Sequence, residues 1–290
     1  MAGERKHPQI RARIAPNLAL QARDRQILLG VHKYRYLSRK QIQAFFGFKS
    51  LTRVNTRLRK LFDAKFLDRI FIPAFWGSPE AYYCLGVNGI MVAAEKSEDI
   101  SIIKKRRRQV SKTSPIFLKH QIMINEVLIA FELAGKRLNG CQIKFSTDNI
   151  QIITRLNKVF RPDGYLVFSY YGKTYPLFLE ADLGTESLKR IQEKMENYLT
   201  FGLSGEYGKL FGCKYFKVIF VFSSAKRLEN IKKLIGGKTD KMFWLAEAKH
   251  ISHQMIFRNI WHRPRKEGLF SFLPKAPACR TGRAQPLAEI

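Results

Sequence analysis

The sequence predicts a mixed α/β protein, α+β overall, in which short helices and a hairpin precede a unit of order αβββαβ. Apolar residues recur at helical spacing up to about residue 62, whereas β-branched and aromatic runs alternate with helical patterns from residue 141 onward. A chain of 290 residues, 46% hydrophobic, is long enough for two domains. We expect a basic arm (1–19), a first domain (20–96), a basic linker (97–114), a second domain (115–262) and a disordered tail (263–290).

The charge of the chain indicates a polyanionic partner. Lys and Arg total 52 against 23 Asp and Glu, a formal net charge of +29. The longest uncharged run, Ala81–Ala94, is interrupted by glycine and falls short of the roughly 20 apolar residues that span a membrane. The N-terminus lacks the apolar stretch of a secretory signal, and the four cysteines lack metal-finger spacing. We therefore expect a cytoplasmic protein with no membrane partner.

Three short helices and a hairpin are predicted in the first domain. The first helix covers residues 23–32, Ser38 caps the second, and Ser50 caps the third. Apolar residues of the third helix form one buried stripe, spaced by three, four and three residues: Leu51, Val54, Leu58 and Leu61. Two strands follow at 66–72 and 81–85, separated by a tip that contains proline and glycine. This order is typical of a winged helix-turn-helix, whose usual ligand is double-stranded DNA.

Polar and cationic side chains cover the other face of the third helix. Such side chains reach phosphates and base edges in the major groove. The predicted DNA-binding residues here are Arg39, Thr52, Arg53, Thr56, Arg57, Arg59 and Lys60. An ordinary solvated helix face is the alternative interpretation.

The densest basic run lies in the linker. We expect phosphate contacts from Lys104, Lys105, Arg106, Arg107 and Arg108, because each neutralised phosphate releases a counterion whatever the base sequence. A solvated hinge explains the same run equally well.

The second domain begins with a long helix from Ser114–Pro115 to about residue 138. Strands are expected at 141–145, 160–170 and 175–183, the last two joined by a turn at Gly172–Lys173. A helix at 187–201 and a buried strand at 217–222 complete the unit.

Three acidic residues are placed to converge in this second domain. Asp163 starts one strand of the hairpin, and Glu180 and Asp182 share a face near the end of its partner. Burying unpaired carboxylates costs several kcal/mol unless a cation joins them, so we expect a divalent metal, Mg²⁺ or Mn²⁺, if the site is active. Arg161, Lys194 or backbone N–H groups could satisfy the same carboxylates in a purely structural cluster.

Three segments carry a family resemblance. Arg161-Pro-Asp-Gly164, Phe178-Leu-Glu-Ala-Asp-Leu-Gly-Thr-Glu186 and Lys194-Met-Glu-Asn-Tyr198 resemble the replication-relaxation family of plasmid and mobile-element proteins, and the winged helix ahead of them fits the same family. The likeness covers roughly residues 20–244. It implies DNA binding connected with replication and relaxation, and a second domain similar to the PD-(D/E)xK nuclease core.

The nuclease motif is incomplete in this chain. The resemblance gives the acidic positions to Asp163 and Glu180, but Asp182 stands where the pattern requires lysine. Lys194, or with less support Lys189, would supply that lysine from the following helix, and Glu126 would complete the metal shell.

Three functions therefore stay open at this point. The interpretation that we favour is a DNA-binding factor of a mobile element without chemistry. The alternative is a metal-dependent endonuclease or nickase, and an RNA-binding protein is a weaker third class. A homodimer and replication or mobilisation proteins are the further partners that we consider.

Overall fold

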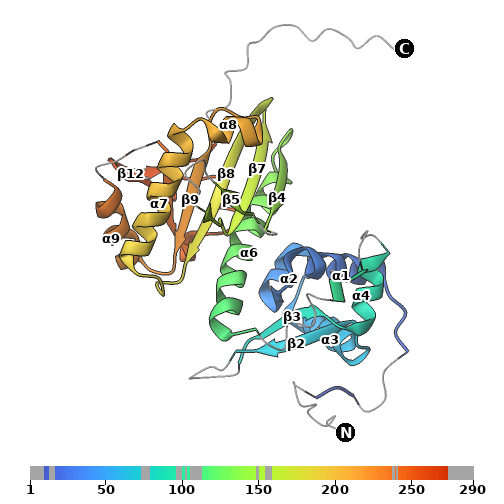
Figure 1. The fold of residues 1–290 in the computed structure, drawn as a ribbon. Coiled ribbons are helices and arrows are strands. Elements are labelled where there is room, and N and C mark those ends of the chain that lie inside the picture. Colours follow the sequence, from blue (N-terminus) through green and yellow to red (C-terminus); the bar gives the residue numbers. More distant parts are fainter. Residues whose placement is uncertain are drawn as a thin grey trace, which may run out of the picture.

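The computed structural model describes residues 10–12, 17–72, 79–95, 100–101, 103–104, 113–147, 150–153, 159–236, 239 and 241–273. It is a mixed α+β structure, as expected. Figure 1 shows two lobes joined through the long helix α6. The predicted hairpin tip around residues 73–78, the linker residues 105–108 and the tail from residue 274 lie outside the described part.

The described part of the N-terminal lobe includes helices α1 to α4 and a small sheet. Serine side chains begin two of the helices: Ser38 Oγ accepts a hydrogen bond from Gln41 N, and Ser50 Oγ accepts one from Arg53 N. The three strands pair antiparallel in the order β1-β3-β2. The elements are α1 (Ala22–Tyr34), β1 (Leu37–Ser38), α2 (Arg39–Phe45), α3 (Leu51–Asp63), β2 (Leu67–Phe71), β3 (Ala81–Leu85) and α4 (Val87–Ala94).

The C-terminal lobe is built on a seven-stranded mixed sheet of order β12-β11-β10-β9-β8-β7-β4. Strands β8, β9 and β10 run parallel, and the other pairs are antiparallel. The main elements are α6 (Pro115–Gly135), β4 (Gln142–Ser146), β7 (Gly164–Tyr170), β8 (Lys173–Asp182), α7 (Leu188–Leu203), α8 (Glu206–Phe211), β9 (Lys217–Phe222), α9 (Ala225–Ile235), β10 (Phe243–Glu247), β11 (Trp261–Arg263) and β12 (Lys266–Phe270). A separate two-stranded ribbon joins β5 (Ile152–Ile153) and β6 (Val159–Phe160).

The sheet separates two layers of apolar side chains. Leu177 and Leu179 of β8 pack in the core that contains α6, whereas Phe178 packs with α7 and α9 on the opposite face. This alternation follows from the two-residue repeat of a strand. It also places Glu180 and Asp182 on the side of α7 and α9.

Helix α6 packs against both lobes. Its side chains share one continuous apolar core with α1 and α3 of the N-terminal lobe and with β7 and β8 of the sheet. Asn125, which is 1% exposed, donates from Nδ2 to the carbonyl oxygens of Tyr34 (3.0 Å) and Tyr36 (2.6 Å). These carbonyls flank Arg35, whose φ of 64° reverses the chain after α1. A buried amide of α6 thus fixes the end of α1.

The predicted start of the tail, residue 263, is too early. Residues 266–270 form strand β12, which pairs with β11, and Phe272 stacks on Trp244 with ring centroids 4.4 Å apart. Phe272 also meets Trp261 edge to face at 4.6 Å. The prolines and glycine of residues 263–290, which are Pro264, Pro274, Pro277, Gly282 and Pro286, gave this segment the composition of a disordered end. Its aromatic residues Phe270 and Phe272 are nevertheless packed against the sheet. No helix in the described part of the chain has the length and apolar content needed to cross a membrane.

The packing of Phe272 predicts that Phe272→Ala lowers the free energy of unfolding by about 3–5 kcal/mol, the usual cost of truncating a buried phenylalanine. Urea denaturation measures the change. Leu269→Ala is the control, because Leu269 is 47% exposed and its truncation should change stability by less than about 0.5 kcal/mol. Equal effects of the two substitutions would contradict the placement of this segment in the fold.

Candidate functional site

Helix α3 presents one polar face to solvent. Thr52, Arg53, Thr56 and Lys60 are exposed, as predicted from the apolar stripe on the other side. Asn55 is exposed beside them. These side chains are available for contact with a ligand.

A cleft lies between α2, α3 and the β2–β3 hairpin, next to this face. Its volume is about 640 Å³, and it is lined by Arg39, Lys40, Asn55, Arg59, Arg69, Phe71, Pro79, Glu80, Ala81 and Tyr83. Arg69 was not predicted as a site residue, because nothing in the sequence indicates that its short strand lies beside α3. Burial lowers the pKa of Arg69 from its ordinary value. The three arginines make the cleft attractive to an anion.

Arg57 does not belong to the exposed face, contrary to prediction. Its Nε donates to Asp24 Oδ1 at 2.6 Å, its Nη2 donates to Asp24 Oδ2, and Asp24 is completely buried in α1. The hydrogen bond from Arg57 therefore holds a buried carboxylate, and it raises the pKa of the guanidinium. Arg57 fixes α3 to α1, and sequence periodicity could not reveal this because the partner lies 33 residues earlier.

Arg59 is also engaged inside the fold, although it lines the cleft. Its Nε donates to Asp63 Oδ2 at 2.8 Å, and its Nη2 donates to the carbonyl oxygen of Ile10 at 2.8 Å. Lys104 is exposed in a short helical stretch, whereas Lys105, Arg106, Arg107 and Arg108 lie outside the described residues.

The second candidate site lies where β8 ends, beside α6 and α7. Asp163 precedes β7, and its Oδ2 accepts a hydrogen bond from Ala181 N at 2.8 Å. His120 of α6 brings Nε2 to 3.2 Å from the same oxygen and to 2.9 Å from the carbonyl oxygen of Ala181. The contact of His120 with Asp163 was not predicted from the sequence, because the two residues lie 43 positions apart.

Burial lowers the pKa of the His120 imidazole, but the hydrogen bond and charge of Asp163 outweigh burial and raise the pKa above its ordinary value. The protonated form is thus favoured by the fold. When His120 is protonated, its charge partly neutralises the Asp163 carboxylate.

Glu180 is 2% exposed and is fully engaged by α7. Tyr198 OH donates to its Oε1 at 2.6 Å, and Lys194 Nζ donates to its Oε2 at 3.1 Å. Burial, followed by the charge of Asp163, raises the pKa of Glu180 to about 7. Lys194 Nζ also lies 3.1 Å from Glu186 Oε2. Lys194 therefore lies between two carboxylates, in the cluster to which the resemblance assigned it.

Asp182 does not join Asp163 and Glu180, contrary to the expected convergence of three carboxylates. Its Oδ2 accepts from Arg227 Nε of α9 at 2.5 Å, and its Oδ1 accepts from Gly184 N at 2.8 Å. Arg227 follows Asp182 by 45 residues, so no local pattern indicated the pair.

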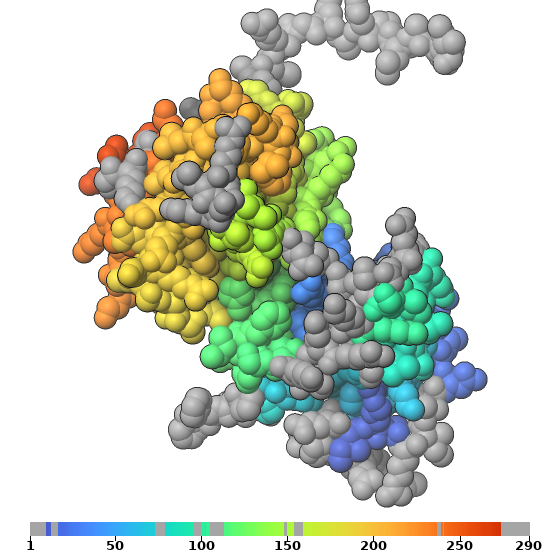
Figure 2. Space-filling view, in the orientation of Figure 1, coloured from blue at the N-terminus to red at the C-terminus, as the bar shows by residue number. Residues whose placement is uncertain are grey.

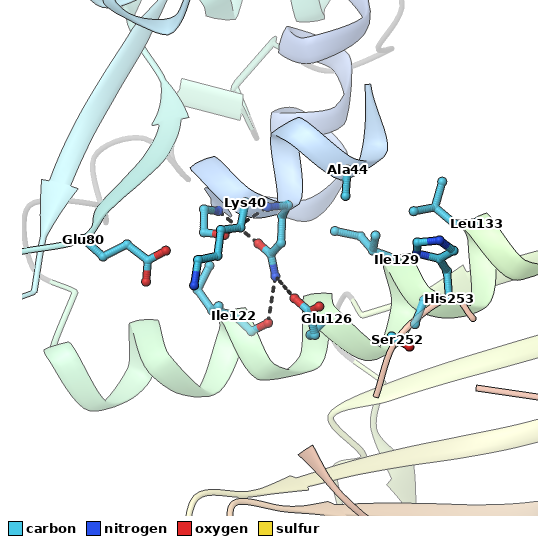
Figure 3. Close-up of a pocket in the computed structure, with 12 residues that line it drawn as sticks. Lys40, Ala44, Glu80, Ile122, Glu126, Ile129, Leu133, Ser252 and His253 are labelled. Atoms are coloured by element: carbon cyan, nitrogen blue, oxygen red, sulfur yellow. Dashed lines mark hydrogen bonds between the residues drawn. The ribbon is translucent and has the colours of Figure 1, made fainter. Parts of the chain in front are cut away.

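Glu126 also lies elsewhere. Its Oε2 accepts a hydrogen bond from Gln41 Nε2 at 3.0 Å, and the same amide donates to the carbonyl oxygen of Ile122 at 3.2 Å. Figure 3 shows these bonds at a cavity of about 340 Å³ between α2 and α6. Glu126 faces the N-terminal lobe because the two lobes pack against different faces of α6.

The carboxylates as placed do not fit a divalent cation. Asp163 and Glu180 border a cavity of about 580 Å³ that Glu186 and Glu193 also line, and three cations line it with them: Arg161, Arg190 and Lys194. The described residues include no group of three or more His, Cys, Asp or Glu side chains arranged to hold a metal. Lys194 and Tyr198 occupy the Glu180 oxygens that a metal would need. The arrangement is that of an internal charge cluster.

The fold and its sites define a mixed α+β protein with a cationic helical lobe and an acidic cluster that is paired internally. The chain belongs to the replication-relaxation family, whose sequence model matches residues 28–211. Membership of this family indicates a role in the replication or relaxation of plasmids or other mobile elements. We found no matching curated protein and no matching solved structure.

The pairing of Arg57 with Asp24 predicts that Arg57→Ala lowers the free energy of unfolding by about 3 kcal/mol, because a buried carboxylate loses its partner. Arg53→Ala is the matched control on the same helix and should change stability by less than about 0.5 kcal/mol. Chemical denaturation of the two variants compares them. A stable Arg57→Ala protein would show that the ion pair is dispensable.

The pairing of His120 with Asp163 predicts a pH-dependent contribution to stability. Because folding raises the pKa of His120, its contribution is fully present below the unfolded-state pKa of about 6.5 and is lost as pH rises through the higher folded-state value. His120→Gln should therefore be more destabilising at about pH 5.5 than at about pH 8.5. Urea unfolding at both pH values tests this. In a protein that carries Asp163→Asn, the loss of stability caused by His120→Gln should no longer depend on pH. If His120→Gln lowers the stability of the otherwise unmodified protein equally at both pH values, the prediction is refuted.

Proposed function

We propose that this protein binds double-stranded DNA of a plasmid or other mobile element and acts in its replication or relaxation, or in the regulation of these processes. The observation that carries the proposal is the exposed polar and cationic face of α3 beside an arginine-lined cleft. The net charge of +29 supports a polyanionic ligand.

The N-terminal lobe supports a winged helix-turn-helix. Helix α2 is followed by a tight turn at Gly47, whose φ is 64°, and then by α3 as the recognition helix. The hairpin of β2 and β3 takes the place of the wing. An α-helix of this kind fits the major groove of B-DNA, where each base pair presents a distinct pattern of donors and acceptors.

The side chains divide into two roles in this proposal. Arg53 and Thr56 lie on the exposed face of α3 and would reach base edges, since arginine pairs with guanine and the threonine methyl contacts thymine. Lys60 and Arg39 would contact phosphates and set the position on the duplex. Arg57 has no role in recognition, because Asp24 holds it.

The C-terminal lobe supports a PD-(D/E)xK-like fold without cleavage activity. Helix α6, the antiparallel strands β4, β7 and β8, helix α7 and the parallel strand β9 follow in the order expected of that core. The charge cluster at the end of β8 satisfies its carboxylates with Lys194, His120 and Arg227. We infer that this lobe is a scaffold whose acidic residues stabilise the fold.

Duplex binding is tested by footprinting and by fluorescence anisotropy over a range of salt concentrations. Arg53→Ala should weaken binding to the protected site by about 1–3 kcal/mol and relax specificity at one base pair. Lys60→Ala should weaken binding to all duplexes and reduce the salt slope by about 1. Lys189→Ala is a control, because Lys189 is exposed on the C-terminal lobe. Equal affinity of the unmodified protein for unrelated duplexes would refute a specific site.

Incubation of supercoiled plasmid with Mg²⁺, with Mn²⁺ and with chelator tests the absence of cleavage. We expect retarded but intact plasmid under all three conditions. Metal-dependent nicks that disappear in Asp163→Ala would instead make the protein an endonuclease or nickase, while leaving the duplex-binding face in place.

A further inference from the structure

A second basic surface lies at the end of the sheet opposite the charge cluster. A cavity of about 590 Å³ opens where β8 and β9 begin, whereas Glu180 and Asp182 lie where β8 ends. Seven residues of strand between Tyr175 and Asp182 separate the two ends by roughly 23 Å. The cavity is lined by Thr174, Tyr175, Pro176, Tyr215, Phe216, Lys217, Thr239, Lys241 and Met242. In Figure 1 this end of the sheet lies near α8.

Aromatic side chains at this cavity are available to a ligand. Tyr215 is 73% exposed. Its ring therefore leaves a large apolar face in contact with water, where a ligand can stack on it. Lys214 Nζ lies 5.4 Å from the centre of that ring. Tyr175 is half-buried at the start of β8 and stacks on Phe168 at 4.5 Å, which holds its ring in place.

Cations accompany these rings, and the described residues that line the cavity include no Asp or Glu. Lys217 Nζ lies 4.5 Å from the Trp244 ring and 5.5 Å from the Phe272 ring. Its neighbours within the described chain are thus aromatic faces rather than carboxylates, and Arg263 also lies over Trp244, at 5.4 Å. Lys241 is exposed at the rim. This surface has the charge to attract a phosphate.

We propose that this cavity binds a segment of single-stranded DNA, with one unpaired base stacked on Tyr215 and the adjoining phosphates at Lys217 and Lys241. Exposed aromatic rings interleaved with cations are the usual means of binding single strands, because every base has a flat face that stacks without sequence preference. The bases of an intact duplex are stacked on each other and cannot reach the ring. The cavity volume falls within the range of about 300–1,000 Å³ typical of ligand sites.

This proposal goes beyond duplex binding and uses different residues. The exposed face of α3 lies on the N-terminal lobe, whereas the cavity lies on the C-terminal lobe. Figure 2 shows the two lobes in contact, with the yellow and orange C-terminal lobe on one side and the blue and cyan N-terminal lobe on the other. Substitutions at one surface should therefore leave the other surface unchanged.

Fluorescence anisotropy of the full chain with labelled oligothymidine tests the stacking contact. Tyr215→Ala should weaken binding to the single strand about 10-fold, whereas Tyr215→Trp should retain it. Binding to a duplex of equal length should change less than about twofold. Phe117→Ala is the matched control, because Phe117 is an exposed aromatic residue of α6, 45% exposed. Since Tyr215 is exposed, its substitution leaves the folded core intact.

Lys241→Gln tests the phosphate contact in the same assay. Neutralising one phosphate contact should reduce the salt slope for the single strand by about 0.7. Lys189→Gln is the control, because it removes an equal charge from an exposed site on α7. It should leave the salt slope of single-strand binding unchanged.

Photocrosslinking of an oligodeoxynucleotide that carries 5-iododeoxyuridine locates the site directly. We expect the crosslinked peptide to contain Tyr215 or Tyr175. Crosslinks confined to α3, or equal effects of Tyr215→Ala and Phe117→Ala, would overturn the proposal. An effect of Tyr215→Ala on an RNA oligomer but not on DNA would overturn it in favour of an RNA ligand. Arg53→Ala, which acts on duplex binding alone, distinguishes failure of this proposal from failure of the duplex-binding one.

Discussion

The amide of Asn125 is the contact on which the arrangement of the two lobes depends. The carbonyl groups of Tyr34 and Tyr36 are buried where the chain reverses after α1, so water does not hydrate them. Both accept a hydrogen bond from the side chain of Asn125 in α6. Asn125 Oδ1 in turn accepts from Gln121 at 3.1 Å, so the buried amide is satisfied on both sides. A leucine here would pack equally well but would leave the carbonyls without partners, at about 1–3 kcal/mol each. The hydrogen bonds of Asn125 thus specify where α6 packs against the end of α1.

The charge cluster has a comparable role within the C-terminal lobe. Each carboxylate at the end of the β7–β8 hairpin meets a cation from a different helix: His120 from α6, Lys194 from α7 and Arg227 from α9. Buried ion pairs add little net stability, but breaking one is costly because it leaves an uncompensated charge. The cluster therefore fixes the positions of three helices relative to one hairpin.

Local signals made much of this fold predictable. Serine caps marked the starts of α2, α3 and α6, and each serine oxygen accepts the expected backbone hydrogen bond. Three residues of the predicted apolar stripe, Val54, Leu58 and Leu61, are buried and identified the exposed face of α3, whereas Leu51 is 50% exposed. The turn at Gly172 identified the β7–β8 hairpin.

Contacts between residues distant in sequence were not predictable. Arg53 and Arg57 look alike on a helical projection, and only the placement of α1 makes Arg57 the partner of Asp24. The spacing of two residues likewise predicted that Asp182 lies with Glu180, but in the structure Asp182 accepts a hydrogen bond from Arg227 of α9. The sequence placed Asp163 and Glu180 near each other, but it could not show which side chains occupy the carboxylate oxygens of Glu180. Strand β12 was missed because its partner, β11, had not been predicted. Phe272 was missed because the rings that it contacts, Trp244 and Trp261, lie in strands that had not been predicted either.

Helix α6 holds the two lobes in one arrangement. It is 21 residues long, about 32 Å at 1.5 Å per residue, and its side chains pack into an apolar core that both lobes share. The relative position of the lobes is therefore built into the fold rather than left to a flexible tether. If both surfaces bind DNA as proposed, the protein holds an opened strand at a fixed position relative to the duplex that it recognises.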